Sequence, residues 1–199
     1  EAVCTLLSIH QRGATAINFA PNVDQMHVVD HLVGEPAEGQ RRNVLLESAR
    51  IARGEVADLA NIKAEELDAL VLPGGFGAAK NLCTFATAGA DMTVNEDLRR
   101  VILDMHAAGK PIGFICIAPA IGAKVLGPDH QVKLTIGNDQ DTAAAIETMG
   151  AMHQNTPPGQ ICEDAANKVV STPAYMLGPD IGAVFTGIDQ LIARVIEIA

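Results

Sequence analysis

The sequence of 199 residues lacks the features that mark several classes of protein. It has no apolar run near the ~20 residues that a membrane-spanning helix needs. It also shows no signal-peptide pattern. Basic residues are few, with 14 Lys and Arg against 24 Asp and Glu, and the net charge is −10. Because nucleic-acid binding needs clustered Lys and Arg, we expect neither a nucleic acid nor a membrane as partner.

Cysteine pairs are also missing. The four cysteines are Cys4, Cys83, Cys116 and Cys162, and none of them forms a Cys-x-x-Cys motif. Zinc sites and disulfide frameworks both depend on such spacings, so we predict neither, and we expect no metal and no cofactor. Free cysteines are typical of a reducing compartment, which is the cytoplasm or an organelle interior such as the mitochondrial matrix.

What is present is the pattern of one globular domain. The chain is 48% hydrophobic with a mean hydropathy of +0.20, enough for a sizeable core. No repeat, linker or low-complexity segment divides it, which predicts a single domain over residues 1–199. Short apolar strands alternate with helices, so we expect an α/β fold with a mostly parallel sheet covered on both faces. The pattern predicts helices at 1–12, 42–53, 64–67, 95–108, 120–126, 141–149 and 180–199, and strands at 14–20, 68–72, 111–115, 132–136, 151–154, 161–163 and 168–171, the last two as a hairpin.

The first predicted helix begins abruptly at Glu1. No initiator Met and no Ser, Thr or Asp cap precede its apolar pattern. We therefore expect an upstream segment, which in an α/β fold would be the first strand.

Cys116 lies at the centre of the predicted chemistry. The apolar run 111–115 ends at this residue, and a helical pattern starts at 120. This order predicts a thiol at the sharp turn between a buried strand and a helix, as in a nucleophile elbow with Cys in place of Ser. Free N–H groups and the helix dipole would favour thiolate over thiol. The alternative is a buried structural cysteine, because free Cys is among the most buried residue types.

A double-glycine turn follows another predicted strand. Gly74 and Gly75 come directly after the apolar run 68–72 and Pro73. Ligands collect at the carboxyl ends of parallel strands, so the N–H groups of Gly75 and Ile117 could form an oxyanion hole beside the sulfur. The alternative is an ordinary strand-to-helix turn. The glycines match neither a P-loop nor a Gly-x-Gly-x-x-Gly motif.

A nucleophilic thiol needs a proton partner, and histidine is the usual one. We expect His106 on a wet helix face and His130 in a surface loop at 127–130. His27 and His31 lie in a long irregular segment, 22–38, with a short strand expected near 27–29. Loops of that length are uncommon unless they are functional, so these two are retained as accessory candidates.

Several segments together resemble one protein superfamily. Leu-Pro-Gly-Gly-Phe-Gly-Ala-Ala-Lys-Asn-Leu (72–82), Gly-Lys-Pro-Ile-Gly-Phe-Ile-Cys-Ile-Ala-Pro (109–119) and Val-Val-Ser-Thr-Pro-Ala-Tyr-Met (169–176) are similar to the ThiJ/PfpI (DJ-1-like) superfamily. Segments 25–31, 42–54 and 135–139 resemble its ElbB-like branch, named for enhanced lycopene biosynthesis and linked to isoprenoid metabolism. The resemblance covers essentially the whole chain.

The resemblance implies a fold and a set of site residues. The fold is a flavodoxin-like three-layer sandwich of the class I glutamine amidotransferase-like type. Cys116 matches the reactive cysteine, and Gly75 and Ile117 match the oxyanion-hole donors, with Gly74 as a possible accessory. Glu1 falls where the superfamily places a Glu against that cysteine. Members are commonly dimers, which implies a homodimer.

Two features of amide-hydrolysing relatives are absent. The peptidase-like members carry a His directly after the Cys, where this chain has Ile117, and no late His-x-Glu pair exists. The resemblance instead implies a glyoxalase-like enzyme that converts methylglyoxal or glyoxal to a 2-hydroxy acid without metal or glutathione. In that scheme the thiolate of Cys116 adds to the aldehyde while a protonated Glu1 shuttles protons. The rival is a non-catalytic redox-sensing or partner-binding protein in which an exposed Cys116 is oxidised. A third hypothesis, an inactive amidotransferase-like subunit of isoprenoid metabolism, rests on the family name alone.

Overall fold

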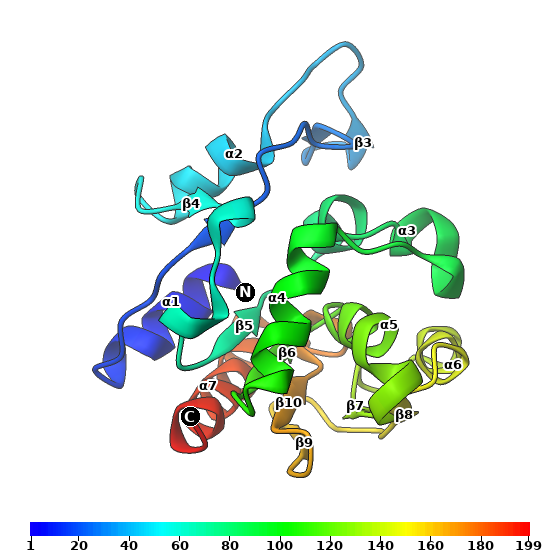
Figure 1. Ribbon diagram of the computed structural model, residues 1–199. Coiled ribbons are helices and arrows are strands. Elements are labelled where there is room, and N and C mark those ends of the chain that lie inside the picture. Colours follow the sequence, from blue (N-terminus) through cyan, green and yellow to red (C-terminus); the bar gives the residue numbers. More distant parts are fainter.

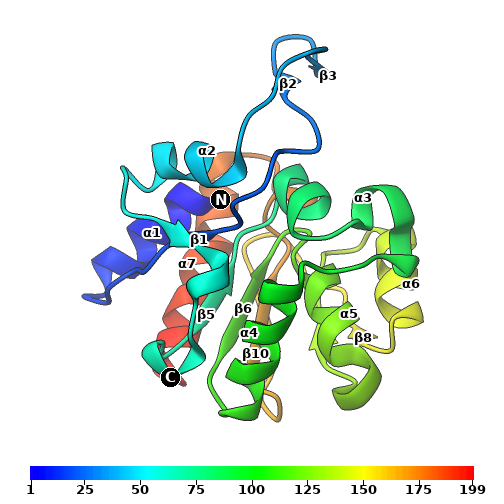
Figure 2. The same cartoon turned by 45° about the horizontal axis from the view of Figure 1, so that its top comes forward.

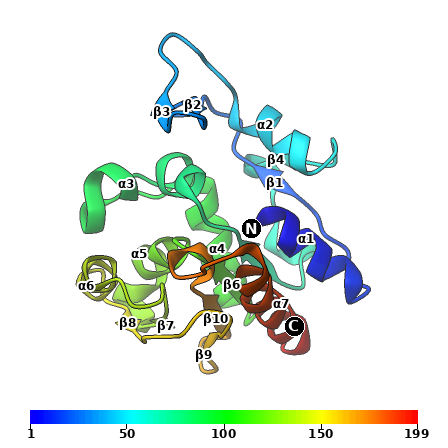
Figure 3. The same ribbon diagram turned by 180° about the vertical axis from the view of Figure 1, so that it is seen from behind.

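The computed structural model describes residues 1–199 and has three layers (Figure 1). Helices α1 (Ala2–Gln11) and α7 (Ile181–Glu197) cover one face of the central sheet, and α4 (Glu96–Ala107) and α5 (Pro119–His130) cover the other. The view from behind brings α1 and α7 to the front (Figure 3). The α/β architecture expected from the sequence is therefore confirmed.

The central sheet has the strand order β5-β6-β10-β9. Strands β5 (Leu70–Leu72), β6 (Ile112–Ile115) and β10 (Val169–Thr172) are parallel, while β9 (Cys162–Asp164) is antiparallel to β10. The hairpin predicted from β9 and β10 is thus confirmed. Because three parallel strands end at the same edge, the turns that follow them lie side by side.

Residues on β6 face the two helical layers alternately. Gly113 lies under α7, where an added Cβ would come within 2.8 Å of Leu191. Phe114 is completely buried and faces α5, where a Cβ on Gly122 would lie 2.9 Å from its ring. Small residues at these two positions let both helices pack closely on the strand that leads to Cys116.

The helix α1 is fixed to α7 by a buried polar cluster. Asp189 accepts hydrogen bonds from Arg12 at 2.8 Å and from Ser8 at 2.6 Å. The Arg12 guanidinium lowers the pKa of the Asp189 carboxyl by hydrogen bonding to it. This cluster anchors the helix that carries Glu1 at its amino end.

Two helix ends differ from the sequence-based expectation. The pattern predicts a helix that stops near 126, with His130 in a loop, but α5 continues through Pro128 to His130. It ends at Gln131, whose φ is +48°. The helix predicted at 141–149 begins one residue earlier, as α6 (Gln140–Thr148), because Asp139 accepts the capping bond from the Thr142 N–H at 2.8 Å. The prediction for α4 is confirmed, with Asn95 as its cap and an apolar face that is buried.

No helix has both the length and the apolar character to cross a membrane.

The remaining elements are short, and several strands are shorter than predicted. These elements are β1 (Phe19–Ala20), β2 (Val29–Asp30), β3 (Glu35–Pro36), α2 (Val44–Ile51), β4 (Ala57–Asp58), η1 (Leu59–Asn61), η2 (Ala64–Glu66), the π-helical turn η3 (Ala78–Leu82), α3 (Phe85–Ala88), η4 (Gly89–Asp91), β7 (Lys133–Leu134), β8 (Met152–His153) and η5 (Ala174–Met176).

The segment 22–41, which we call the arm, projects from the sheet (Figure 2). Its strands β2 and β3 form an antiparallel hairpin, with Val29 opposite Pro36. Leu32 near the tip is 97% exposed. The base of the arm returns to the body where the Met26 N–H donates to Asn81 Oδ1 at 2.9 Å.

A cavity of about 1030 Å³ lies between β1 and β5, and most of its lining is apolar. Strand β1 pairs only with β4, and β5 pairs only with β6, so each strand turns an unpaired edge toward this space. Helices α1, α2 and α7 contribute the other walls. The single domain over 1–199 stays a prediction.

Candidate active site

Cys116 is at the turn between β6 and α5, the position that the sequence predicts. Its φ is +62°, a left-handed conformation that non-glycine residues rarely adopt. The Cys116 N–H donates to the Thr172 carbonyl at 2.9 Å, which joins the turn to the end of β10. Pro119 begins α5, where its missing N–H is not needed. The strained turn is therefore held by the sheet on one side and by the helix on the other.

The carboxyl of Glu1 faces this turn from the amino end of α1. It lies within hydrogen-bonding reach of the Cys116 sulfur, and its Oε2 accepts a hydrogen bond from the Gly74 N–H at 3.0 Å. The first helix, the double-glycine turn and the nucleophile elbow thus meet at one point, although they are far apart in the sequence.

Glycine is required at the two positions of the turn for different structural reasons. A Cβ on Gly74 would lie 2.5 Å from the Ile115 carbonyl oxygen and 2.8 Å from the Cys116 Cβ, so no side chain fits there. Gly75 has a φ of +88° and open space beside it. The N–H groups of Gly75 and Ile117 lower the pKa of Cys116 by hydrogen bonding, so both lie beside its sulfur. Their role as oxyanion donors stays a prediction, since such donors must face the oxygen of a bound substrate.

The charge state of the thiol is the opposite of the expected one. Burial, the negative charge of Glu1 and a hydrogen bond with Glu1 raise the pKa of Cys116 to about 12, from an ordinary value of 9.0. The N–H groups of Gly75 and Ile117 lower this pKa, but less than the other causes raise it. The backbone N–H groups therefore favour thiolate as expected, but burial and the neighbouring carboxylate outweigh them, so the expected net preference for thiolate is wrong for the resting protein.

Cys116 is also less accessible than the redox hypothesis expects, with 6% of its surface exposed. One side of the residue packs into a small apolar cluster with Ile115, Val170 and Ala174, backed by residues of α7. The other side faces the polar groups of Glu1 and the glycine turn. The sulfur is thus buried and at the same time in contact with an acid and two backbone donors.

The histidines retained from the sequence do not reach the thiol. Glu1, Gly75 and Ile117 are the groups that act on the ionisation of Cys116, and no histidine is among them. His27 contacts Lys80 through its Nδ1 at 3.1 Å, and His31 is exposed on the arm. Neither is placed to exchange a proton with the sulfur.

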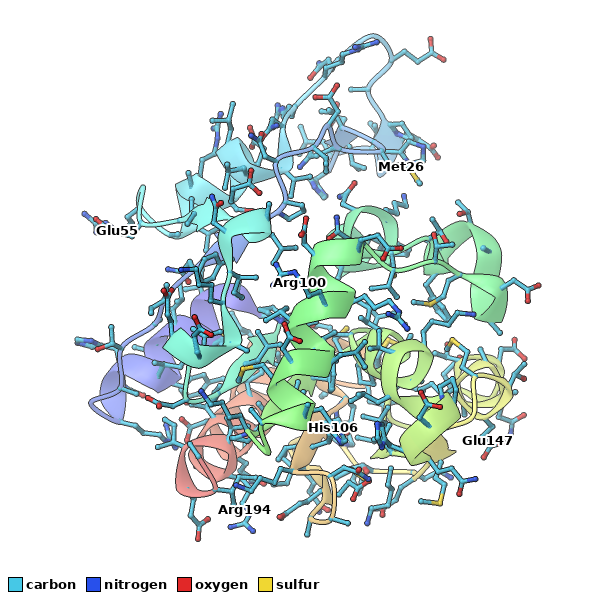
Figure 4. The ribbon with its side chains drawn as sticks, in the orientation of Figure 1. Met26, Glu55, Arg100, His106, Glu147 and Arg194 are labelled. Carbon is cyan, nitrogen blue, oxygen red and sulfur yellow. The ribbon has the colours of Figure 1, made fainter.

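The other histidines have structural surroundings. His106 is half-buried: its ring centroid lies 4.2 Å from that of His130, and it contacts Asn167 (Figure 4). The expectation of a wet surface for His106 is therefore wrong. His130 is exposed as expected, but it lies in the last turn of α5 and not in a loop, because α5 extends far enough to bring its ring beside His106. His153 accepts a hydrogen bond from the Ile136 N–H, and burial lowers its pKa.

Three structural features near the site were not predicted from the sequence. Ala174 follows β10 with a φ of +44° and packs in the cluster around Cys116. Its neighbour Tyr175, the only tyrosine, is 51% exposed. The third feature is the π-helical turn η3, which begins three residues after Gly75. These residues lie in segments 72–82 and 169–176, which carry the resemblance, but the resemblance gave them neither a role nor a conformation.

No three His, Cys, Asp or Glu side chains are grouped so that they could hold a metal ion. All four cysteines are free thiols. The chemistry that this site offers comes from a thiol, a carboxyl and two backbone N–H donors.

A strained cysteine elbow at the carboxyl edge of a parallel sheet, facing a carboxyl from the first helix, defines a class I glutamine amidotransferase-like protein of the DJ-1/ThiJ/PfpI type. Solved structures support the fold. An isoprenoid biosynthesis protein with an amidotransferase-like domain from Ehrlichia chaffeensis superposes with a TM-score of 0.91 at 37% identity, over 100% of this chain and 90% of that one. DJ-1beta of Drosophila melanogaster gives 0.53 at 16% identity, over 99% and 87%, and shows the fold alone.

Curated relatives identify the family. The human mitochondrial glutamine amidotransferase-like class 1 domain-containing protein 3 is 46% identical over 100% of this chain and 76% of its own length. The mitochondrial ES1 protein of Danio rerio is 35% identical over 99% and 78%. The chain belongs to this family of glutamine amidotransferase-like class 1 proteins. No general family model matches the sequence.

Proposed function

We propose that this protein is a glyoxalase-like enzyme that converts methylglyoxal or glyoxal to a 2-hydroxy acid without glutathione or added metal. The observation that carries the proposal is the contact between the Glu1 carboxyl and the Cys116 sulfur beside two converging N–H groups. A thiol that shares a proton with a carboxylate can become a nucleophile without first losing that proton to solvent.

The first step is addition of sulfur to the aldehyde. The Cys116 thiol passes its proton to the Glu1 carboxylate as the sulfur bonds to the aldehyde carbon. The carbonyl oxygen becomes an alkoxide, which the N–H groups of Gly75 and Ile117 stabilise. The resting pair of thiol and carboxylate and the reactive pair of thiolate and neutral acid contain the same single proton. The high pKa of the thiol is therefore compatible with nucleophilic attack.

The next steps move a proton between adjacent carbons. Glu1 returns its proton to the alkoxide and, again a carboxylate, removes the hydrogen from the carbon bonded to sulfur. The resulting enediolate accepts that proton back from Glu1 at the neighbouring carbon, while the hydroxyl proton on the sulfur-bearing carbon passes to the other oxygen, which leaves a thioester and a hydroxyl group. Water hydrolyses the thioester, releasing the 2-hydroxy acid and restoring the thiol. The overall reaction adds one water to the 2-oxoaldehyde to give the 2-hydroxy acid, and it needs no oxidant or reductant.

Burial of the thiol favours this proposal over a redox sensor. Oxidation by peroxide depends on thiolate character and on exposure, and Cys116 has a raised pKa and is only 6% exposed. A sensor would instead give selective oxidation of Cys116 by mild peroxide, seen by mass spectrometry, with no turnover of methylglyoxal.

The test is conversion of methylglyoxal to lactate by the purified protein without glutathione and with a chelator present. Cys116→Ala should abolish turnover. The matched control is Cys162→Ala, which removes another buried free thiol from β9, on the far side of β10. Turnover by Cys116→Ala at the wild-type rate contradicts the mechanism, and no turnover by any variant contradicts the proposed function.

The name of the Ehrlichia protein supports membership of the ElbB-like branch linked to isoprenoid metabolism. The mitochondrial names of the curated relatives support a mitochondrial matrix location over a cytoplasmic one. A homodimer is part of the same proposal and is tested by sedimentation of the purified chain.

A further inference from the structure

Lys80 is a half-buried lysine whose charge no carboxylate balances. Other half-buried lysines donate to backbone carbonyls: Lys110 to Ala64, Lys124 to Ala90 and Lys168 to Ile198. The Lys80 ammonium instead contacts the ring nitrogen of His27 and forms no ion pair. Those three lysines also form no ion pair, but Lys80 is the one of the four whose ammonium has neither a carboxylate nor a carbonyl as partner.

The contact with His27 adds no charge at this point. A lysine ammonium can only donate, so the Nδ1 of His27, 3.1 Å away, must accept. The imidazole is then neutral, with its proton on Nε2. The second neighbour of the ammonium is the ring of Phe76, whose centroid is 5.2 Å away. Two neutral groups therefore hold the ammonium in place and leave its positive charge available.

Lys80 belongs to the segment that follows the double-glycine turn. Phe76 directly follows Gly75, whose N–H points at the Cys116 sulfur. Lys80 is in η3, and the N–H groups of Ala78 and Ala79 bond to the Gly75 carbonyl at 3.0 and 3.3 Å. The ammonium is thus attached to the same turn that supplies one oxyanion donor.

The arm keeps the lysine in this position. Met26, labelled in Figure 4 at the base of the arm, donates its N–H to Asn81 Oδ1 at 2.9 Å. His27 is the next residue and meets Lys80 from the same side. Asp24, an acidic residue of the arm near His27, faces Arg41 at 3.9 Å. Two contacts from consecutive arm residues therefore fix two consecutive residues of η3.

We infer that Lys80, held by His27 and Phe76, is a specificity-determining residue that selects 2-oxoaldehydes carrying an anionic group, a carboxylate or a phosphate. This inference rests on the proposed glyoxalase function and names its substrate class. A single unit charge near a bound substrate favours an anionic substrate over a neutral one by about tenfold in kcat/KM. The same charge has no effect on the chemistry at the sulfur, so the preference should appear only between substrates of different charge.

The experiment compares three 2-oxoaldehydes: neutral methylglyoxal, the carboxylate γ,δ-dioxovalerate and hydroxypyruvaldehyde phosphate. The wild type should prefer one or both anionic substrates by about tenfold. Lys80→Met should remove that preference by lowering kcat/KM for the anionic substrates by about tenfold more than for methylglyoxal, and Lys80→Arg should restore it. The matched control is Lys63→Met, which removes an exposed lysine that faces Glu66. Comparison of the two anions shows whether carboxylate or phosphate is the group recognised.

A binding measurement separates failure of this inference from failure of the proposed function. Inorganic phosphate is titrated into the wild type and Lys80→Met by calorimetry, with acetate as the carboxylate probe. Weaker binding of either anion to Lys80→Met supports the inference even if no aldehyde is turned over. Equal anion binding by both proteins, or equal kcat/KM for neutral and anionic aldehydes in the wild type, overturns it and leaves the glyoxalase proposal standing where methylglyoxal is converted.

Discussion

The carboxylate of Glu1 accepts a hydrogen bond from the Gly74 N–H at 3.0 Å and so connects the first helix to the double-glycine turn. The same carboxyl faces the Cys116 sulfur. One side chain therefore both orients the turn that carries the Gly75 donor and sets the ionisation of the thiol. Loss of this carboxyl should affect charge and geometry together.

Replacing Glu1 by alanine should lower the pKa of the Cys116 thiol. The change removes the charge and the hydrogen bond that raise this pKa, while burial, which is its largest cause, remains. The measurement is thiolate absorbance against pH, as the difference between each protein and its Cys116→Ala counterpart. Aldehyde turnover should fall by at least about a hundredfold, the usual contribution of a general acid–base.

The matched control for Glu1→Ala is Glu55→Ala. Glu55 is exposed in the turn between α2 and β4 and is not among the groups that act on the ionisation of Cys116. It should leave both the thiol titration and turnover unchanged. An unaltered Cys116 titration in Glu1→Ala would show that the carboxyl does not control the thiol.

Replacing Gly74 by alanine should destabilise the protein. The new Cβ would lie 2.5 Å from the Ile115 carbonyl oxygen, which is fixed in β6 and cannot move aside cheaply. Overpacking of this kind costs about 1–3 kcal/mol. Urea denaturation measures the loss of stability, and turnover should fall as the elbow and the turn are pushed apart.

Gly77 offers a control three residues away. An added Cβ there meets nothing within 4 Å, and its backbone is in the ordinary right-handed helical region. Gly77→Ala should therefore match the wild type in stability or exceed it slightly. If both alanine variants lose stability equally, close packing of Gly74 against the elbow is not the cause.

Much of the fold and part of the site could be predicted from the sequence, for identifiable reasons. The period of apolar residues located α4 and β6, and the Gly/Pro punctuation located the turn before Cys116. The resemblance pointed to Glu1, Gly75 and Ile117 as neighbours of the sulfur. These signals are local or come from motifs, so they were available without the tertiary structure.

The properties that were missed depend on contacts between distant segments. The raised pKa of Cys116 results from burial and from Glu1, which is 115 positions earlier in the chain. The contact between His27 and Lys80 joins the arm to a π-helical turn that no pattern predicts. The extension of α5 through Pro128 is a case in which tertiary packing overrides a local breaker.

The thiol of Cys116 should make stability fall as the pH rises above 9. Its pKa is about 12 in the folded protein against an ordinary 9.0. Above pH 9 the unfolded chain loses this proton while the folded protein keeps it, so alkali favours unfolding. The loss from this group should be about 2 kcal/mol between pH 8 and pH 10.5.

The alkaline effect is measured by urea denaturation across that pH range, in the wild type and in Cys116→Ala. Burial also raises the pKa values of the Cys83 and Cys162 thiols, so both proteins should lose stability in alkali. The difference between the two slopes isolates Cys116. Parallel slopes would mean that Cys116 ionises as freely in the folded protein as in the unfolded chain.

The cavity between β1 and β5 should accept one further parallel strand. Glu1 lies beside Gly74, at the carboxyl end of β5, so a segment running into Glu1 through the cavity would be parallel to β5. The connection through α1 to β1 would then be a βαβ unit, the usual unit of a parallel sheet. An extension of about five apolar β-branched residues in front of Glu1 should raise the melting temperature, because it fills apolar space and pairs two open edges. A Gly/Ser extension of equal length is the control. Hydrogen exchange at Leu70–Leu72 should slow only with the apolar extension; equal exchange and equal melting temperatures for the two extensions would show that the cavity does not take a strand.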